Sequence, residues 1–134
     1  MKIRRVPKWL RWIVKDLSLA IRPFILLSAE VYADYHSVSP SGKTLALVAH
    51  EKVHLRRQKE MWLIRWGFWY FYSKEFCLQE ELLAITEEMR IYKQHGFVFD
   101  IQCRARVLSS YWFYRHCVCY RDAVERLETI WRNL

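Results

Sequence analysis

Glycine and proline are scarce in this chain, which has only three of each among 134 residues. This scarcity excludes a linker-rich or low-complexity chain, because such chains depend on residues that break helices and strands. The chain also has no internal repeat. With 53% hydrophobic residues in 16.5 kDa, the composition predicts one compact domain that buries a real core and is predominantly helical.

The chain also lacks the uninterrupted apolar run of a secretory signal. Residues 1–15 begin with positive charge, but Lys8, Arg11 and Lys15 interrupt the apolar stretch that a signal peptide needs. Without such a signal, and without a paired CxxC framework, the four cysteines are expected to be reduced thiols. The pattern favours this reading over a second metal site built around Cys103, Cys117 and Cys119 with His116.

Acidic residues are in the minority, at 14 against 22 Lys and Arg, which gives a formal net charge of +8. The basic residues are scattered rather than gathered in one stripe, so a solvated basic face is favoured and we expect no nucleic acid partner. The alternative of a nucleic acid contact depends on the C-terminal third, with Arg104, Arg106, Arg115, Arg121, Arg126, Arg132, Tyr111, Trp112 and Tyr114. Residues 1–20 form a basic amphipathic segment, for which packing onto the domain is favoured over contact with an acidic membrane surface.

One short motif constrains the function more tightly than any other feature. His50, Glu51 and His54 form the pattern HExxH. On a helix, residues four apart lie on one face, so both imidazoles can bind a single zinc ion while Glu51 lies beside the open coordination position. Residues 39–42 form a turn-like cluster, and residues 43–66 contain neither Gly nor Pro, which places the motif inside a helix. The alternative is a helix whose histidines only make hydrogen bonds.

A zinc site of this kind needs a third protein ligand. The long pattern HExxHxxGxxH would require Gly and His where the chain has Arg57 and Glu60, so that class is excluded. A histidine four residues after His54 would fall at Gln58, which is a poor zinc ligand. The remaining solution is a glutamate from a second helix, which completes the His2Glu set of a catalytic zinc.

Residues 73–92 predict that second helix. Ser73 can cap it, and apolar side chains recur at spacings of four, three, four and three residues at Leu78, Leu82, Ile85, Met89 and Tyr92. Glu81 falls at the margin of this apolar stripe, Glu80 on the opposite face, and Glu88 two turns beyond Glu81. A carboxylate along an apolar face is costly unless it is paired or metal-bound. We therefore predict Glu81 as the third ligand, with a salt bridge to an arginine as the alternative and Glu88 and Glu80 as the next candidates.

The motif and its surroundings resemble a known family. Residues 50–58, the aromatic stretch after them and residues 80–84 are similar to the minimal gluzincins, zincin-like metallopeptidase domains that include short bacterial and bacteriophage HExxHxxxQ proteins. The resemblance covers roughly residues 25–95. In gluzincins a small residue commonly follows the glutamate ligand by three positions, which matches Glu81 and Ala84. The aspartate often found next is Ile85 here, so no support for His50 is identified.

The resemblance implies a single zincin-like domain of the α+β class over residues 1–134. Its parts would be the basic N-terminal segment at 1–20, a metal-site core at 24–95 and a C-terminal helical part at 97–134. The core would hold an active-site helix, a second ligand-bearing helix and a small edge strand or sheet. Residues 122–134 predict a closing helix.

The activity implied is zinc-dependent hydrolysis of peptide bonds. Zn2+ held by His50, His54 and Glu81 would activate a water molecule, and Glu51 would act as the general base that passes its proton to the leaving amine. Larger gluzincins add a Tyr or His that stabilises the oxyanion. Spacing does not choose among the candidates for that role, which are Tyr92, His95, Tyr114 and His116.

Two further segments bear on substrate and partner. Residues 24–35 are rich in β-branched and aromatic residues and predict one or two strands. By resemblance, residues 31–35 would form an edge strand on which an extended peptide adds, or a strand that only covers the helix. Residues 61–72 concentrate aromatic side chains but are too few to span a bilayer. Core packing is the expectation for them, with an interfacial membrane contact or an assembly surface as alternatives.

Two functions therefore stay open. The first is a zinc metallopeptidase that acts on a peptide or protein substrate. The second is a non-catalytic structural or binding protein, for example a component of a phage virion or its assembly, which retains the zincin fold and has a protein partner. We expect a cytoplasmic location, or a virion-associated one if the chain is encoded by a phage.

Overall fold

The computed structural model describes residues 1–8, 18–110, 114 and 116–134. Within these ranges the N-terminal part forms a three-stranded sheet of β1 (Lys2–Arg5), β2 (Leu19–Ile21) and β3 (Phe24–Leu27). β3 is the central strand, parallel to β1 and antiparallel to β2. The predicted amphipathic segment at 1–20 thus supplies β1 and the start of β2, while its residues 9–17 lie outside the described residues.

Most of the rest of the described chain is helical. The helices are α2 (Ala29–Tyr35), α3 (Gly42–Met61), α4 (Leu63–Tyr72), α5 (Lys74–Gln94), α6 (Ile101–Ser110) and α7 (Tyr120–Asn133). Ser41 caps α3 by accepting a hydrogen bond from the Thr44 amide at 3.2 Å, and Ser73 caps α5 through the Phe76 amide at 3.1 Å. The predictions of a mostly helical α+β fold, of a helix around the motif, of a second helix after Ser73 and of a closing helix are confirmed.

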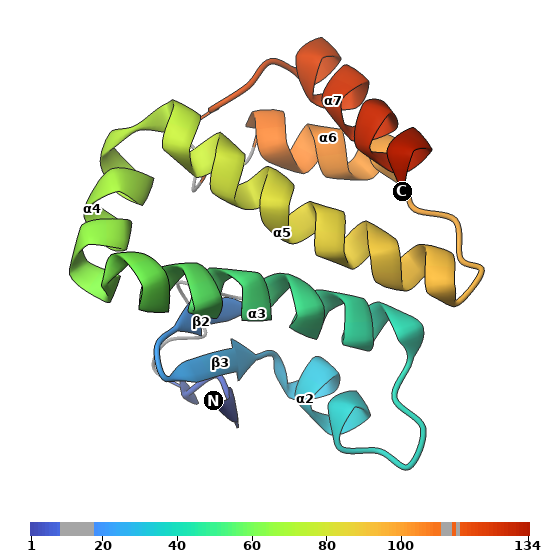
Figure 1. Ribbon diagram of the computed structural model, residues 1–134. Helices are drawn as coiled ribbons and strands as arrows, with labels where there is room; N and C mark the ends of the chain where they lie inside the picture. The colour runs from blue at the N-terminus through green and yellow to red at the C-terminus, as the bar shows by residue number, and fades with distance from the viewer. Residues whose placement is uncertain (9–17, 111–113, 115) are drawn as a thin grey trace.

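The elements are stacked in layers around the long helices α3 and α5. Figure 1 shows the sheet and α2 on one side of α3, with α5 on its other side and α6 and α7 beyond α5. α4 joins α3 to α5 at one end of the molecule. This path runs the two long helices side by side, so residues about thirty positions apart in the sequence meet between them.

Two apolar cores lie on either side of this helix pair. One core is formed by the sheet, α2 and α3 around Ile25 and Leu27, and the other by α5, α6 and α7 around Ile85, Leu108 and Leu127. The buried polar and charged residues of the described chain lie instead on α3 and α5, at Thr44, His50, Glu51, His54, Gln58, Glu80, Glu81 and Glu88. We call the contact between α3 and α5 that includes His50, His54, Glu80, Glu81 and Glu88 the polar interface.

The predicted edge strand at residues 31–35 is wrong, because this segment belongs to helix α2. The Ser28 hydroxyl accepts a hydrogen bond from the Val31 amide at 3.3 Å, and Glu30 lies in the first turn. Both features favour a helix start over a strand. Val31 and Tyr32 then pack against the core between the sheet and α3. The strand prediction is confirmed only for Phe24–Leu27.

The aromatic stretch is helix α4, and the expectation that it packs in the core is wrong for most of its side chains. Trp66 and Tyr70 are buried, with their rings stacked at 4.6 Å, and they contact Cys77 of α5. The remaining large side chains of the stretch are exposed or partly exposed. Among the described helices, none is long and apolar enough to cross a membrane.

Candidate metal centre

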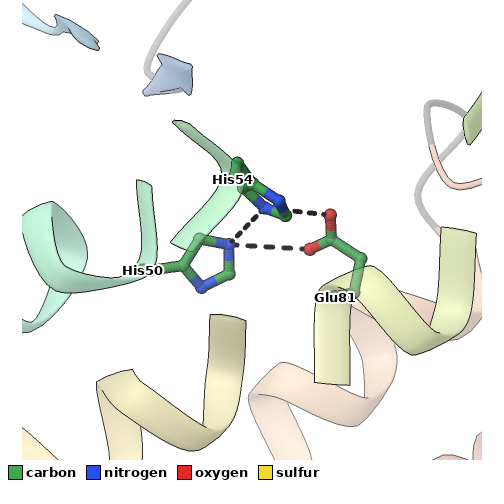
Figure 2. A group of neighbouring side chains, drawn as sticks. All are labelled: His50, His54 and Glu81. Atoms are coloured by element: carbon green, nitrogen blue, oxygen red, sulfur yellow. Dashed lines mark hydrogen bonds and ion pairs between the residues drawn. The ribbon is translucent and has the colours of Figure 1, made fainter. Parts of the chain in front are cut away.

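The three predicted ligands meet in the polar interface. His50 and His54 lie one turn apart on α3, and Glu81 faces them from α5, as Figure 2 shows. The Nε2 atoms of the two histidines are 3.3 Å apart. His54 Nε2 lies 3.3 Å from Glu81 Oε1, and His50 Nε2 lies 3.6 Å from Glu81 Oε2. All three side chains are buried, and their ligand atoms lie within 4.8 Å of one another.

The contacts among these three side chains are incomplete as hydrogen bonds and are better explained by a shared metal ion. Two imidazole Nε2 atoms point at the same carboxylate, and 3.6 Å is too long for a hydrogen bond from His50. Within the described part of the chain, the buried Glu81 Oε2 and His54 Nδ1 have no hydrogen-bond partner. A buried carboxylate oxygen without a partner is costly, and a cation held between the three ligand atoms would remove that cost. Two imidazoles and one carboxylate form a donor set that zinc accepts.

Glu88 supplies the support for His50 that the family pattern left unidentified. Its Oε2 lies 3.2 Å from His50 Nδ1, the ring nitrogen that faces away from the ligand cluster. Arg104 of α6 donates a hydrogen bond to the other oxygen of Glu88. A carboxylate on Nδ1 fixes the tautomer and ring orientation, which leaves Nε2 free for a metal. Glu88 therefore lies behind the predicted ligand His50 rather than in the place of Glu81.

The electrostatics of the cluster are those of a compact buried charge network. Burial lowers the pKa of His50, but the close carboxylates of Glu81 and Glu88 outweigh burial and raise this pKa to about 10. Burial raises the pKa of Glu81, yet the charge of His54 and the close contacts with both imidazoles hold this pKa well below its usual range. Burial likewise raises the pKa of Glu88, and His50 and Arg104 reverse that effect so that the net shift is downward. Both carboxylates are thus ionised beside the imidazoles.

Glu51 lies outside the ligand cluster but beside the same cavity. It is buried on α3, and the Ser18 hydroxyl donates a hydrogen bond to its Oε1 at 2.5 Å. This contact joins the motif to the residue that precedes β2. The placement agrees with a carboxylate that is poised near a metal without binding it.

A cavity of about 490 Å3 opens beside the cluster. Its polar end is formed by His50, Glu51 and His54. Its apolar walls come from β2 and from the side of α4 that includes Leu63, Ile64, Gly67, Phe68 and Phe71. A cavity of this size can receive one large side chain or a short ligand segment.

Tyr114 is the oxyanion candidate that reaches this cavity. It lines the cavity, and its burial together with the charge of Glu81 raises its pKa well above the usual value, so it keeps its proton. The other three candidates make ordinary contacts. His95 and His116 contact main-chain carbonyls through Nδ1, and the Tyr92 ring packs edge-on against Phe99.

Tyr70 contacts the predicted ligand Glu81, and the sequence did not predict this contact. Its hydroxyl donates a 2.5 Å hydrogen bond to Glu81 Oε1 from α4. Burial and the charge of Glu81 raise the pKa of Tyr70, which keeps the hydroxyl a donor. The aromatic residues at 61–72 were the only sequence signal for it, because the contact depends on how α4 folds back between α3 and α5.

Gln58 and Glu80 also have roles that their sequence positions did not reveal. The Gln58 side chain donates to the Ala20 carbonyl at 2.8 Å and accepts from the Arg22 amide at 3.0 Å, so it fastens β2 to α3. Glu80 was expected on the face of α5 opposite the apolar stripe, where a side chain would be exposed to solvent. That expectation is wrong. Glu80 is buried, and it accepts hydrogen bonds from Arg57 at 2.8 Å and from Trp66 at 2.9 Å.

Among the described residues, the sole cluster of three metal-binding side chains is His50, His54 and Glu81. Cys103 and Cys119 are exposed and Cys117 is half-buried, and none of the three is in a disulfide.

Comparisons of the chain with protein-family models, with curated proteins and with solved structures found no match. The resemblance to minimal gluzincins thus stays an expectation from the motif, and the function is argued from the site.

Proposed function

We propose that the protein is a zinc-dependent metallopeptidase-like hydrolase that cleaves peptide bonds at the polar interface. The observation that carries the proposal is the buried cluster of His50, His54 and Glu81, with Glu51 beside the same cavity. Three ligands of the type His2Glu leave a fourth position for water or substrate in a catalytic zinc site. The zincin-like family remains part of this proposal.

Each residue of the site would have a separate role in the hydrolysis. A bound zinc ion would supply Lewis acidity toward water and the substrate carbonyl. Glu51 would accept a proton from the attacking water and pass it to the leaving amine nitrogen. Tyr114 lines the cavity with its hydroxyl on the Glu81 carboxylate, so it would stabilise the developing negative charge on the carbonyl oxygen by turning that hydroxyl toward the substrate. Glu88 would hold the His50 ring in place through Nδ1.

The test is cleavage of a peptide library by purified protein together with metal analysis. We expect about one equivalent of zinc, hydrolysis that a chelator abolishes, and recovery when zinc is added back. Glu51→Gln keeps the size of the side chain and removes its basicity, so it should lower turnover by at least about a hundredfold without changing zinc content. Unchanged turnover in that variant would eliminate the mechanism.

A second candidate is a non-catalytic structural or binding protein that keeps the metal for stability. The hydrogen bond from Ser18 to Glu51 favours it, because this contact occupies one oxygen of the general base. Ser18→Ala frees that oxygen and separates the candidates. If neither wild-type protein nor Ser18→Ala cleaves any peptide while both hold zinc, the non-catalytic role is favoured, with a particle or assembly, such as that of a phage, as the proposed setting.

A further inference from the structure

Helix α4 and Trp62 before it expose several large apolar side chains to solvent. We define the α4 surface as the side chains of Trp62, Ile64, Phe68, Trp69 and Tyr72, which are between 40% and 88% exposed. The Phe68 and Tyr72 rings stack at 5.4 Å, and the Trp69 ring meets Tyr72 edge-on. The opposite side of the helix packs on α5, where Trp66 and Tyr70 are buried. The packing of α4 on the domain therefore does not depend on the exposed side chains.

Trp62, at the corner between α3 and α4, has an unfavourable backbone conformation. Its φ is 67° and its ψ is 131°, a combination that bulky residues rarely adopt. Its side chain is nevertheless 81% exposed, so it contributes little packing within the chain. A strained residue that holds an indole outward is more easily explained by an external contact than by folding.

The charge around the α4 surface is basic. Residues 61–74 contain no Asp or Glu but include Arg65 and Lys74, both exposed. The preceding turn of α3 adds exposed Arg56 and Lys59, while Glu60 is ion-paired with Arg57 at 3.0 Å. An apolar aromatic face with a basic border has the composition of helices that lie in the interface of an anionic bilayer.

We propose that the α4 surface docks on the surface of a membrane that contains anionic lipid, with α4 lying in the plane of the interface. Two copies of the chain would bring net charges of +8 together, which opposes self-association through this face, whereas an anionic bilayer attracts the same charge. Trp and Tyr side chains prefer the headgroup region, where an indole or phenol keeps a polar contact. This surface is independent of the proposed hydrolysis and requires no metal.

The docked orientation has a consequence for the cavity. Ile64 and Phe68 belong both to the α4 surface and to the cavity wall beside His54. Docking therefore brings the mouth of the cavity to the bilayer surface. A ligand that lies at that surface would reach the cavity without crossing bulk water.

The test is vesicle flotation with the full chain, using vesicles of phosphatidylcholine and phosphatidylglycerol in equal parts and vesicles of phosphatidylcholine alone. Ile64→Ser removes a side chain that is 88% exposed, so the fold should be unaffected. Val98→Ser is the matched control, because Val98 is 89% exposed in the loop after α5, at the opposite end of the molecule from α4 (Figure 1). Trp62→Ser and Phe68→Ser provide a second and third variant of the surface.

We expect wild-type protein to bind the anionic vesicles more tightly than the neutral ones, and to release them as salt is raised. Ile64→Ser should lower the partition coefficient about tenfold, because its apolar area no longer leaves water. Val98→Ser should bind like wild type. The proposal is overturned if wild type binds neither vesicle, or if Ile64→Ser binds as tightly as wild type. It is also overturned if the chain forms dimers that Ile64→Ser dissociates while vesicles stay unbound, which would identify a second copy as the occupant.

Discussion

Zinc is expected to raise the thermal stability of the domain by an amount that can be calculated. The ligands come from α3 and α5, so a bound ion fastens two helices that belong to different cores. A ligand that binds only the folded state adds about 4 kcal/mol to the unfolding free energy when its concentration is about a thousand times Kd. For a chain of 134 residues the unfolding entropy is about 280 cal/mol/K near the transition, so Tm should rise by about 15 °C.

The assay is calorimetric melting of chelator-treated protein with zinc added in steps. His54→Ala removes one ligand and should abolish the zinc-dependent rise in Tm. Glu81→Ala should do the same, because a carboxylate from α5 completes the site. A Tm that responds to neither chelator nor zinc would refute the reasoning and would identify His50 and His54 as core histidines. A full response in Glu81→Ala would refute the choice of third ligand alone.

Proton competition sets the direction of the pH dependence. The pKa of His50 is raised to about 10, above the ordinary 6.5, so protonation stabilises the metal-free fold below pH 6.5 and this contribution is lost as pH rises through about 10. Zinc requires the neutral imidazole, so its apparent affinity should increase with pH by about tenfold per unit for each proton released. Titration calorimetry in buffers of different ionisation enthalpy measures the released proton. Zinc binding without proton release at pH 7 would contradict the pairing of His50 with Glu81 and Glu88.

Three other substitutions have defined outcomes. Glu88→Gln weakens the hold on His50 Nδ1, so the zinc Kd should rise about tenfold to a hundredfold, and an unchanged Kd would show that Glu88 does not support the ligand. Gly67→Ala should stabilise the fold by about 1 kcal/mol in urea unfolding, because an added Cβ meets nothing within 4 Å inside a helix; a loss of stability would contradict the open space seen there. Gln58→Ala leaves two main-chain groups of the β2 edge without their side-chain partner and should cost about 1–3 kcal/mol in the same assay, whereas a neutral effect would mean that water replaces the amide.

The helices that carry the site could be predicted because their signals are local. Ser41 and Ser73 cap their own helices, and the four-residue spacing of His50 and His54 fixes their common face. The position of Glu81 at the margin of an apolar stripe led to its choice as the third ligand, and its carboxylate does lie beside His50 and His54 of α3. These inferences need only helical geometry.

What could not be predicted depends on how distant elements pack. Glu80 projects from the side of α5 that α4 covers, and its burial follows from Trp66, which no periodicity in α5 reveals. The contact of Glu88 with His50 could have been predicted, because seven residues make two helical turns and place Glu88 in line with Glu81 on the side of α5 that faces His50. The contact of Glu88 with Arg104 could not, since α6 reaches it only after a turn of the chain.

The residues at 31–35 show a different limit of sequence reasoning. β-branched and aromatic side chains suit a half-buried strand, but they suit a short helix equally well when that helix packs one face on a core. The hydroxyl of Ser28 favours the helix because it caps the first turn, and a single capping residue is a weak indication in the sequence.

The polar interface also bears on how the domain opens. The two larger apolar cores lie on opposite sides of the α3 and α5 pair, and the contact between those helices includes buried hydrogen bonds and charges. A smaller apolar cluster joins Met61, Trp66 and Cys77 at the α4 end of the pair. Structural units that share few apolar contacts tend to open separately, with their own free energies of hydrogen exchange. The metal-free chain should therefore exchange its amides as two units, the sheet with α2 and α3, and α5 with α6 and α7. A bound ion merges them into one cooperative unit, which makes occupancy of the site a determinant of cooperativity as well as of stability.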